Sequence, residues 1–357
     1  MTTEHLSGRA RAFPLLINLI TNSLQRSIIK LQQAATEMNS CRERVTFGFQ
    51  GGKEYLMYVI TGATGNIGSK IANILLEKGE KVRVISRSGA RLQHFVDKGA
   101  EAAVGDLKDG DFVARAFNGA TAIFAMIPPE YGAADFRAYQ NEVGENLATG
   151  IRKSGVKYAV SLSSQGAELT EGTGPILGLH DQEERLNGLE GVHVLRLRPT
   201  YFMENLFMNI PIINQYGFAG SAIRGDLKFA MIATRDIAAY ATERLIKLDF
   251  TGKTVKGLLG QRDISLDEAI TIIGRRIDKP ALQYVQFSYD ETLSGLAKMG
   301  FSPDVSRLFV EMSKALNNGL FGVNLYRTEE NTTPTSIEEF AETFVRHYAA
   351  ATLRKAA

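Results

Sequence analysis

The sequence is poor in cysteine, in long apolar runs and in net charge. Its one cysteine, Cys41, cannot form a disulfide within the chain, which fits a reducing compartment, so we expect a cytoplasmic protein. No apolar run approaches the roughly 18 residues that a membrane-spanning helix needs. A formal net charge of +2 over 357 residues gives no reason to expect nucleic acid or an anionic membrane as a partner. The five scattered histidines lack metal-ligand spacing, so we expect no metal.

Acidic residues are also missing near the N-terminus, between His5 and Thr36. Apolar residues recur in this stretch at helical spacing, namely Leu16, Ile20, Leu24, Ile28 and Leu31. Three interpretations stay open: an organellar targeting helix, a helix that binds a membrane surface or a partner, or a segment upstream of a biological start at Met57. We favour the third, and expect residues 1–54 to be an N-terminal extension that is disordered or a loosely attached helix.

The most informative stretch is a glycine-rich turn from Thr61 to Gly68. An apolar segment over residues 55–60, rich in strand formers, precedes it, and apolar residues at helical spacing follow it. In such a strand-to-helix turn, Gly62 allows the tight turn, Gly65 lets a ligand approach the backbone, and Gly68 lets the helix pack closely. Free amides and the helix dipole favour a pyrophosphate there. The turn therefore predicts a dinucleotide-binding site.

No acidic residue follows the next predicted strand, residues 81–86. A site that prefers NAD usually carries Asp or Glu at this point, about 20 residues past the glycines, to bind the ribose hydroxyls. Arg87 and Arg91 stand here instead, and either could hold a 2′-phosphate. The alternative is that both are ordinary solvated residues. We expect NADP(H) to be preferred over NAD(H).

Strands and helices alternate from residue 55 onward, which is typical of an α/β protein. We expect a Rossmann-type doubly wound parallel sheet over residues 55–200. A smaller, mostly helical C-terminal substrate region should follow over residues 201–357, interwoven with the first. The expected strands of the sheet are 55–60, 81–86, 102–104, 122–126, 156–162 and 192–198. Later in the chain we expect helices capped by Asp236 and Ser265, a strand over residues 282–287, and three further helices.

The catalytic pair of ordinary short-chain dehydrogenases is missing as well. Those enzymes use a Tyr and a Lys four residues later, and the lysine prepares the tyrosine to act as an acid or base. From Tyr55 onward no tyrosine has a lysine at that distance, although Tyr240 has Arg244. Interconversion of alcohols and ketones by the usual route is therefore not expected.

These motifs, in their order and spacing, resemble the NmrA-like family of atypical short-chain dehydrogenases over about residues 56–344. The stretches that carry the resemblance are Thr61–Gly68, Arg87, Gly105-Asp106-Leu107, Ser161–Ser164, His180 with Glu184, residues 197–205 and residues 232–236. The family includes NAD(P)H-dependent quinone and azo-dye reductases and a nitrogen-repression regulator. The resemblance thus implies an NADPH-dependent reductase that transfers hydride to a quinone, azo compound or similar small electrophile. The alternative is a non-catalytic NADP-binding redox sensor that acts through a protein partner.

The resemblance also implies how the cofactor is bound. It places Asp106 beside the adenine, and Pro128 with its neighbours along the ribose and nicotinamide. The full set of expected cofactor-binding residues is Gly62, Thr64, Gly65, Asn66, Ile67, Gly68, Arg87, Asp106, Leu107, Ile127, Pro128 and Ser163. For Asp106 a turn or cap role, and for Ser163 a strand-end hydrogen bond, stay open as alternatives.

The catalytic candidate is His180. It could donate a proton to a reduced quinone or azo nitrogen, or orient the nicotinamide ribose. It could equally be a partly buried histidine whose ring is satisfied by Glu184 or by a backbone carbonyl. Tyr201 and Phe202 are expected to form the wall of an apolar substrate pocket. Whether the protein forms a homodimer stays open.

Overall fold

The computed structural model describes residues 56–321 and 326–356 of the chain. The extension expected over residues 1–54 lies outside these residues. From Leu56 onward the described residues cluster as one unit. No helix in this part of the chain is both long and apolar enough to cross a membrane.

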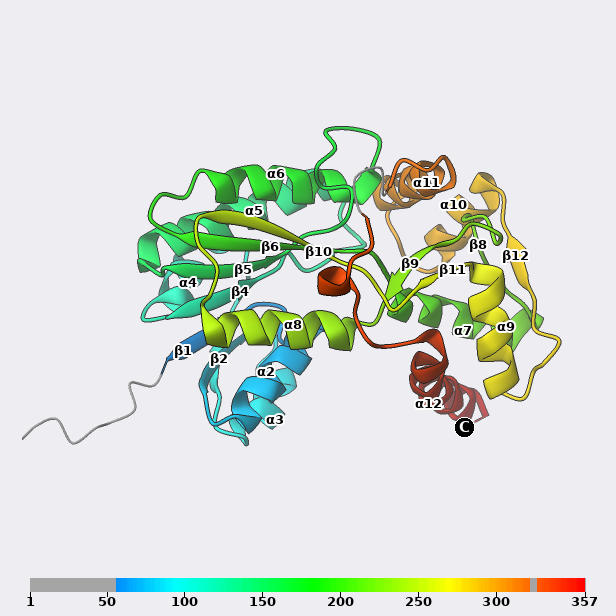
Figure 1. Cartoon of the computed structure of the whole chain (residues 1–357), viewed down its shortest axis with the longest axis horizontal. Helices are drawn as coiled ribbons and strands as arrows, with labels where there is room; N and C mark the ends of the chain where they lie inside the picture. The colour runs from blue at the N-terminus through cyan, green and yellow to red at the C-terminus, as the bar shows by residue number, and fades with distance from the viewer. Residues whose placement is uncertain (1–55, 322–325, 357) are drawn as a thin grey trace, which may run out of the picture. The chain divides into compact units, whose positions relative to one another are not determined.

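Seven parallel strands form the central sheet in the order β10-β6-β5-β4-β1-β2-β3 (Figure 1). Their bounds are β1 (Met57–Ile60), β2 (Lys81–Ser86), β3 (Glu101–Val104), β4 (Ala122–Ala125), β5 (Tyr158–Leu162), β6 (His193–Pro199) and β10 (Lys253–Leu258). The chain runs outward in one direction from β1 through β2 to β3, and in the other from β4 through β5 to β6. The predicted doubly wound sheet is confirmed. Its switch point lies between β1 and β4, where such sheets bind ligands at the carboxyl ends of their strands.

Strand β10 is the one strand of this sheet that the sequence pattern does not reveal. It pairs in parallel with β6, with Lys253 opposite Val194 and Leu258 opposite Pro199. Because it lies at the edge of the sheet, most of its residues are only partly buried, and no apolar run marks it. A segment that follows residue 201 in the chain thus contributes an edge strand to the central sheet.

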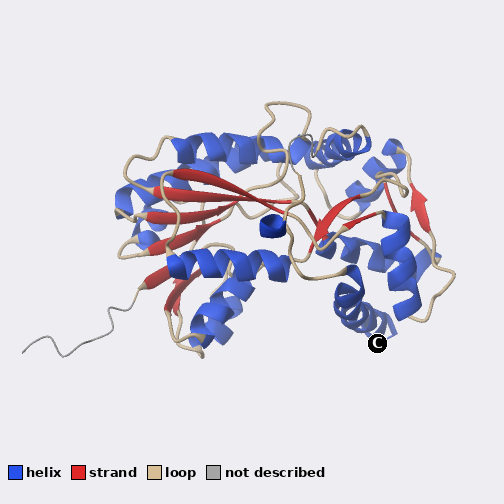
Figure 2. Cartoon of the chain, viewed as in Figure 1, coloured by secondary structure: helices blue, strands red, loops and turns tan. Residues whose placement is uncertain are grey.

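Helices cover both faces of the sheet (Figure 2). One face carries α2 (Gly68–Glu77), α3 (Gln93–Val96) and α8 (Thr234–Lys247), and the other carries α4 (Gly110–Phe117), α5 (Phe136–Ser154) and α6 (Leu177–Asn187). Side chains alternate between the two apolar layers, since Tyr58 and Ile60 pack on the α2 side and Val59 packs on the α5 side. The central strands β1, β4 and β5 are buried on both faces, which explains their nearly continuous apolar sequences.

The C-terminal region is mostly helical and has its own apolar core, which includes Leu206, Ile270 and Phe344. Its elements are the 3₁₀ segment η3 (Met203–Asn209), α7 (Ile210–Tyr216), α9 (Leu266–Arg276), α10 (Tyr289–Lys298), α11 (Pro303–Asn317) and α12 (Ile337–Ala356). Two small sheets join them, one of β7 (Tyr201–Phe202), β9 (Phe229–Ile232) and β11 (Asp263–Ile264), the other of β8 (Ala219–Ser221) and β12 (Tyr284–Gln286). Short 3₁₀ turns also occur at η1 (Ala90–Leu92), η2 (Gly174–Ile176) and η4 (Glu329–Asn331).

One predicted helix cap is correct and the other is wrong. Ser265 caps α9, and its side chain accepts a hydrogen bond from the Glu268 amide. Asp236 does not cap α8, because it lies inside the first turn and accepts hydrogen bonds from the amide and hydroxyl of Thr335. The cap is supplied from another element: the Glu204 carboxylate accepts from the Thr234 amide at 3.0 Å. The first turn of α8 is therefore capped by Glu204, which is distant in sequence, rather than by Asp236.

Candidate functional site

The glycine-rich turn leads from β1 into α2. Gly62 has φ +62°, in the left-handed region that glycine tolerates best. A Cβ atom on Gly68 would overlap the carbonyl oxygen of Gly62, so glycine lets α2 begin close against the turn. A Cβ atom on Gly65 would have only that oxygen within 4 Å, at 3.3 Å, and Gly65 is exposed. The turn is therefore tight on its inner side and open on the side of Gly65.

The start of α2 offers hydrogen-bond donors. Among the described residues, the amides of Asn66, Ile67 and Gly68 have no protein acceptor. The first turn of α2 carries no acidic side chain, and the helix dipole adds positive character there. The turn therefore fits the pyrophosphate of a dinucleotide, which these amides would hold.

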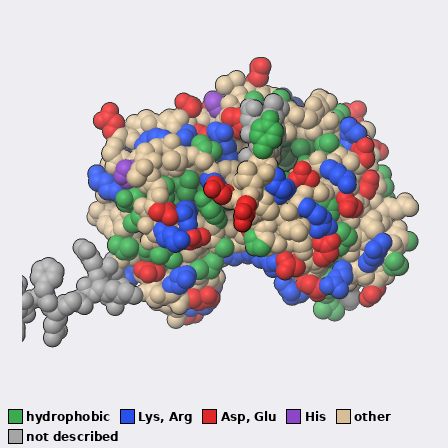
Figure 3. All heavy atoms as spheres, in the orientation of Figure 1, with side chains coloured by type: hydrophobic (Ala, Val, Ile, Leu, Met, Phe, Trp, Pro, Cys, Tyr) green, Lys and Arg blue, Asp and Glu red, His purple; other side chains and the backbone are tan. Residues whose placement is uncertain are grey.

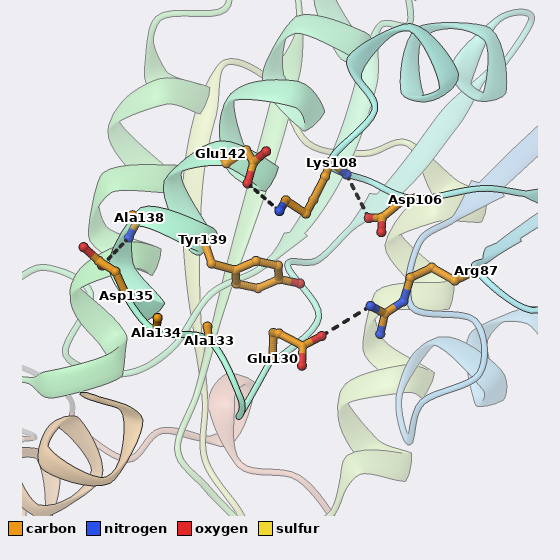
Figure 4. A pocket seen from close by; sticks show the side chains of 10 residues that line it. All are labelled: Arg87, Asp106, Lys108, Glu130, Ala133, Ala134, Asp135, Ala138, Tyr139 and Glu142. Carbon is orange, nitrogen blue, oxygen red and sulfur yellow. Dashed lines mark hydrogen bonds and ion pairs between the residues drawn. The ribbon is translucent and has the colours of Figure 1, made fainter. Parts of the chain in front are cut away.

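A cavity of about 510 Å³ opens at the carboxyl ends of β2, β3 and β4 (Figure 4). Arg87 reaches it from the end of β2, Asp106 from the end of β3, and Glu130 from the loop after β4. The remaining lining residues are Lys108, Ala133, Ala134, Asp135, Ala138, Tyr139 and Glu142. The cavity therefore occupies the place where a doubly wound sheet receives the adenosine half of a dinucleotide.

Two ion pairs lie in this cavity. Arg87 Nη1 is 3.3 Å from Glu130 Oε2, and Lys108 Nζ is 3.1 Å from Glu142 Oε2. The Arg87 and Glu130 side chains are 67% and 40% exposed, so their pairing stabilises by no more than about 1 kcal/mol. A charged ligand can therefore replace either partner at little cost.

Tyr139 points into the cavity from α5 (Figure 4). Its hydroxyl donates a hydrogen bond to the Pro128 carbonyl, at 2.9 Å. Burial, with the Glu130 carboxylate nearby, raises the pKa of Tyr139 to about 12. The hydroxyl therefore stays protonated at neutral pH, and its hydrogen bond to Pro128 anchors the loop after β4 to α5.

The other expected cofactor residues surround this cavity and the turn. Asp106 lines the cavity, and its Oδ1 accepts from the Lys108 amide at 3.0 Å, so it also makes the turn that was the alternative. Leu107 is buried, and Ile127 packs on the apolar layer around α5. The Thr64 carbonyl accepts from Arg91 Nη2 at 3.1 Å. The structure thus gathers these residues near the switch point, while their contact with a cofactor stays a prediction.

Ser163 is engaged in a buried charged cluster that the sequence did not reveal. Its hydroxyl donates to Glu183 Oε1 at 2.5 Å, and Glu183 is only 3% exposed. Arg198 donates to the same carboxylate through Nε at 2.9 Å and Nη2 at 2.5 Å, and Arg196 Nη1 lies 3.6 Å from it. The Ser163 amide also donates to the Leu197 carbonyl at 2.8 Å, so the strand-end hydrogen bond that was the alternative for Ser163 is present. The cluster fixes α6 against the ends of β5 and β6.

His180 lies on α6 and is partly buried. Its Nδ1 is 2.9 Å from the Ala167 carbonyl oxygen. Since a carbonyl can only accept, Nδ1 carries the proton, and Nε2 is left for another partner. Glu184 instead accepts a hydrogen bond from Asn187. The hydrogen bond to a backbone carbonyl, which was the alternative interpretation of His180, is therefore present. This bond also orients the ring.

Tyr201 and Phe202 form β7 and pack into two apolar cores. Tyr201 contacts the Phe229 ring edge-on at 5.3 Å, and burial raises the pKa of its hydroxyl far above the usual value. Phe202 packs against the layer around α2. Neither residue lines the larger cavity, so a role for either in a substrate pocket stays a prediction.

A smaller cavity of about 110 Å³ lies beside the turn, among α2, η3, α8 and α12. Asn66, Lys70 and Phe207 line it. Lys70 Nζ donates to the Asn66 carbonyl at 2.6 Å, and burial lowers the pKa of this ammonium. In the space-filling view the surface is hollowed between α8 and α12, with Lys and Arg side chains along the hollow (Figure 3). A helical lysine gives no signal in the sequence that would have revealed this contact.

The sheet, the turn and the cavity define a dinucleotide-binding protein of the Rossmann class that lacks the Tyr/Lys pair. The chain belongs to the NmrA-like family, whose model matches residues 57–341. The predicted family is therefore confirmed.

Relatives of this chain are named as reductases. An NAD(P)H azoreductase from Xenophilus azovorans is 25% identical over 258 residues, which are 72% of this chain and 86% of the relative. A (4-alkanoyl-5-oxo-2,5-dihydrofuran-3-yl)methyl phosphate reductase from Streptomyces griseus is 26% identical over 263 residues, 74% of this chain and 88% of the relative. The predicted class, an NAD(P)H-dependent oxidoreductase, is confirmed by these relatives.

A solved structure shows the same fold. The NADPH-dependent quinone oxidoreductase of Escherichia coli, complexed with NADPH, has a TM-score of 0.67 to this chain at 21% identity. The match covers 81% of this chain and 99% of that one.

Proposed function

We propose that this chain is an NADPH-dependent reductase that delivers hydride to a quinone, an azo compound or a similar small electrophile. The observation that carries the proposal is the open turn before α2, next to a cavity with Arg87 at its rim. By their names, two relatives act on an azo compound and on a phosphate ester that carries an unsaturated lactone ring.

The residues of this chain account for binding. The amides of Asn66, Ile67 and Gly68 hold the pyrophosphate, and Arg87 offers a guanidinium to the 2′-phosphate. NADPH supplies the hydride when it is bound. The protein needs to orient the cofactor against the electrophile and exclude water, and it needs no activated tyrosine for this.

His180 is the proposed proton donor to the reduced substrate. The Ala167 carbonyl holds the Nδ1–H and fixes the ring, so that only Nε2 can serve the substrate. In the neutral ring Nε2 is an acceptor, and it donates a proton only from the imidazolium form. The role therefore requires the charged ring during turnover.

The proposal is tested by NADPH oxidation with a panel of quinones, azo dyes and unsaturated lactones, followed by the loss of cofactor absorbance. We expect turnover with at least one class, and His180→Gln should lower kcat while leaving the Kd for NADPH unchanged. NADPH binding without turnover across the panel would favour the redox sensor instead. A fall in NADPH affinity for His180→Gln equal to the fall in kcat would place His180 in cofactor binding rather than proton transfer.

A further inference from the structure

The carboxylate that the end of β2 lacks is supplied by the loop after β4. Glu130 lies 43 residues after Arg87 in the sequence, in the loop that follows β4, yet its Oε2 is 3.3 Å from Arg87 Nη1. Figure 4 shows the two side chains meeting at the rim of the larger cavity. An acidic side chain therefore stands beside the guanidinium that would receive a 2′-phosphate.

The loop that carries Glu130 is fixed by the C-terminal region. Ser302, just before α11, donates its amide to the Tyr131 carbonyl at 2.8 Å and its hydroxyl to the Ala133 carbonyl at 2.6 Å. The rings of Tyr131 and Phe301 stack with centroids 4.5 Å apart. The Glu130 carbonyl accepts from the Ala133 amide at 3.0 Å. The backbone of Glu130 is thus held in place, which lowers the entropy lost when its side chain pairs.

The charges in the cavity oppose a phosphate. Its cationic side chains are Arg87 and Lys108, and its carboxylates are Asp106, Glu130, Asp135 and Glu142. The carboxylates outnumber the cations, and both cations are already paired with one of them. A 2′-phosphate must therefore displace Glu130 from Arg87 and then lie close to its charge. The ribose hydroxyls of NADH carry no charge and are not repelled, because a carboxylate can accept hydrogen bonds from them.

We propose that Glu130 is a specificity-determining residue that narrows the preference of this site for NADPH over NADH. It competes with the 2′-phosphate for Arg87, and it offers an acceptor to the ribose hydroxyls of NADH. The inference rests on the proposed function, since it concerns the same cofactor site. We expect the wild-type protein to use both cofactors, because Arg87 favours NADPH and Glu130 favours NADH.

The test is Glu130→Gln, with Kd measured by titration for NADPH and for NADH. Glutamine keeps the size of the side chain and removes the charge. An exposed ion pair is worth up to about 1 kcal/mol, so we expect NADPH to bind roughly three- to fivefold more tightly. NADH should bind about two- to threefold more weakly because a neutral acceptor is weaker than a carboxylate. The Kd ratio of the two cofactors should thus shift by on the order of tenfold.

Glu142→Gln is the matched control. Glu142 lines the same cavity and pairs with Lys108 rather than Arg87, so its removal changes the charge of the cavity by the same amount. We expect it to leave the ratio within about a factor of two. An unchanged ratio in Glu130→Gln, or an equal shift in Glu142→Gln, would overturn the inference while NADPH turnover still supported the proposed function. If the wild-type chain binds neither cofactor, the proposed function fails as well.

Discussion

Arg87 is the residue on which the proposed NADPH preference depends. Its side chain is 67% exposed, so its hydrogen bonds to a phosphate lie at the weaker end of the charge-assisted range. Arg87→Ala should weaken NADPH binding by about tenfold, which corresponds to about 1.4 kcal/mol, and leave NADH nearly unchanged. Titration of both cofactors against both proteins measures this. Equal losses for NADPH and NADH would show that Arg87 is structural.

Two glycines of the turn should respond differently to substitution. Gly65→Val should abolish NADPH binding and leave a folded protein, because the new side chain points to the open side where the pyrophosphate would lie. Gly68→Ala should lower Tm, because its Cβ overlaps the Gly62 carbonyl oxygen. Thermal unfolding and cofactor titration of both variants separate the two effects. Retained NADPH affinity in Gly65→Val would mean that the turn has no role beyond the fold.

Some site residues were predictable from sequence because they directly follow strands. Arg87 and Asp106 reach one cavity, as parallel strand ends require. Glu130 and Glu183 were not predictable, since each meets its partner from a different element and no spacing in the sequence relates them. The partner of a single charged residue in a loop or helix can be identified only once the order of the strands in the sheet is known.

At the scale of elements, the buried Glu183 cluster should determine how firmly α6 packs. Glu183→Ala would leave Arg198 without its main partner, and breaking a buried pair in this way costs about 3–5 kcal/mol. Denaturant unfolding measures the loss. Glu184→Ala, an exposed neighbour on the same helix, should change stability by less than about 0.5 kcal/mol. Similar small effects in both variants would show that water replaces the Glu183 contacts.

Elements differed in how well their sequences revealed them. The central strands β1, β4 and β5 were found because their apolar runs are nearly continuous, whereas the edge strand β10 and the two- or three-residue strands β7, β8 and β11 carry no such run. The caps of α8 and α9 show the same division: Ser265 acts locally, while Glu204 caps α8 from thirty positions away. Local sequence signals thus predict where an element lies, whereas contacts such as the α8 cap depend on residues that are distant in sequence.

At the scale of the whole molecule, we predict that a chain beginning at Met57 folds and binds NADPH as well as the full chain. The family match begins at Met57, and β1 begins there too. The sheet and its two apolar layers consist of residues from Leu56 onward. Tm and the Kd for NADPH of the two chains decide the point. A drop of several degrees, or weaker NADPH binding, would show that the upstream residues pack on the domain.

The central claim, that this chain reduces an electrophile with a bound nicotinamide cofactor, is tested most directly by a single turnover. The protein is held in excess over NADPH and mixed with a quinone, and the absorbance of the bound cofactor is followed. We predict that it decays in a protein-dependent phase that yields one reduced quinone per NADPH, and that Gly65→Val shows no such phase. Bound NADPH that persists in the presence of the quinone panel would contradict the account and leave a protein that binds the cofactor without using it.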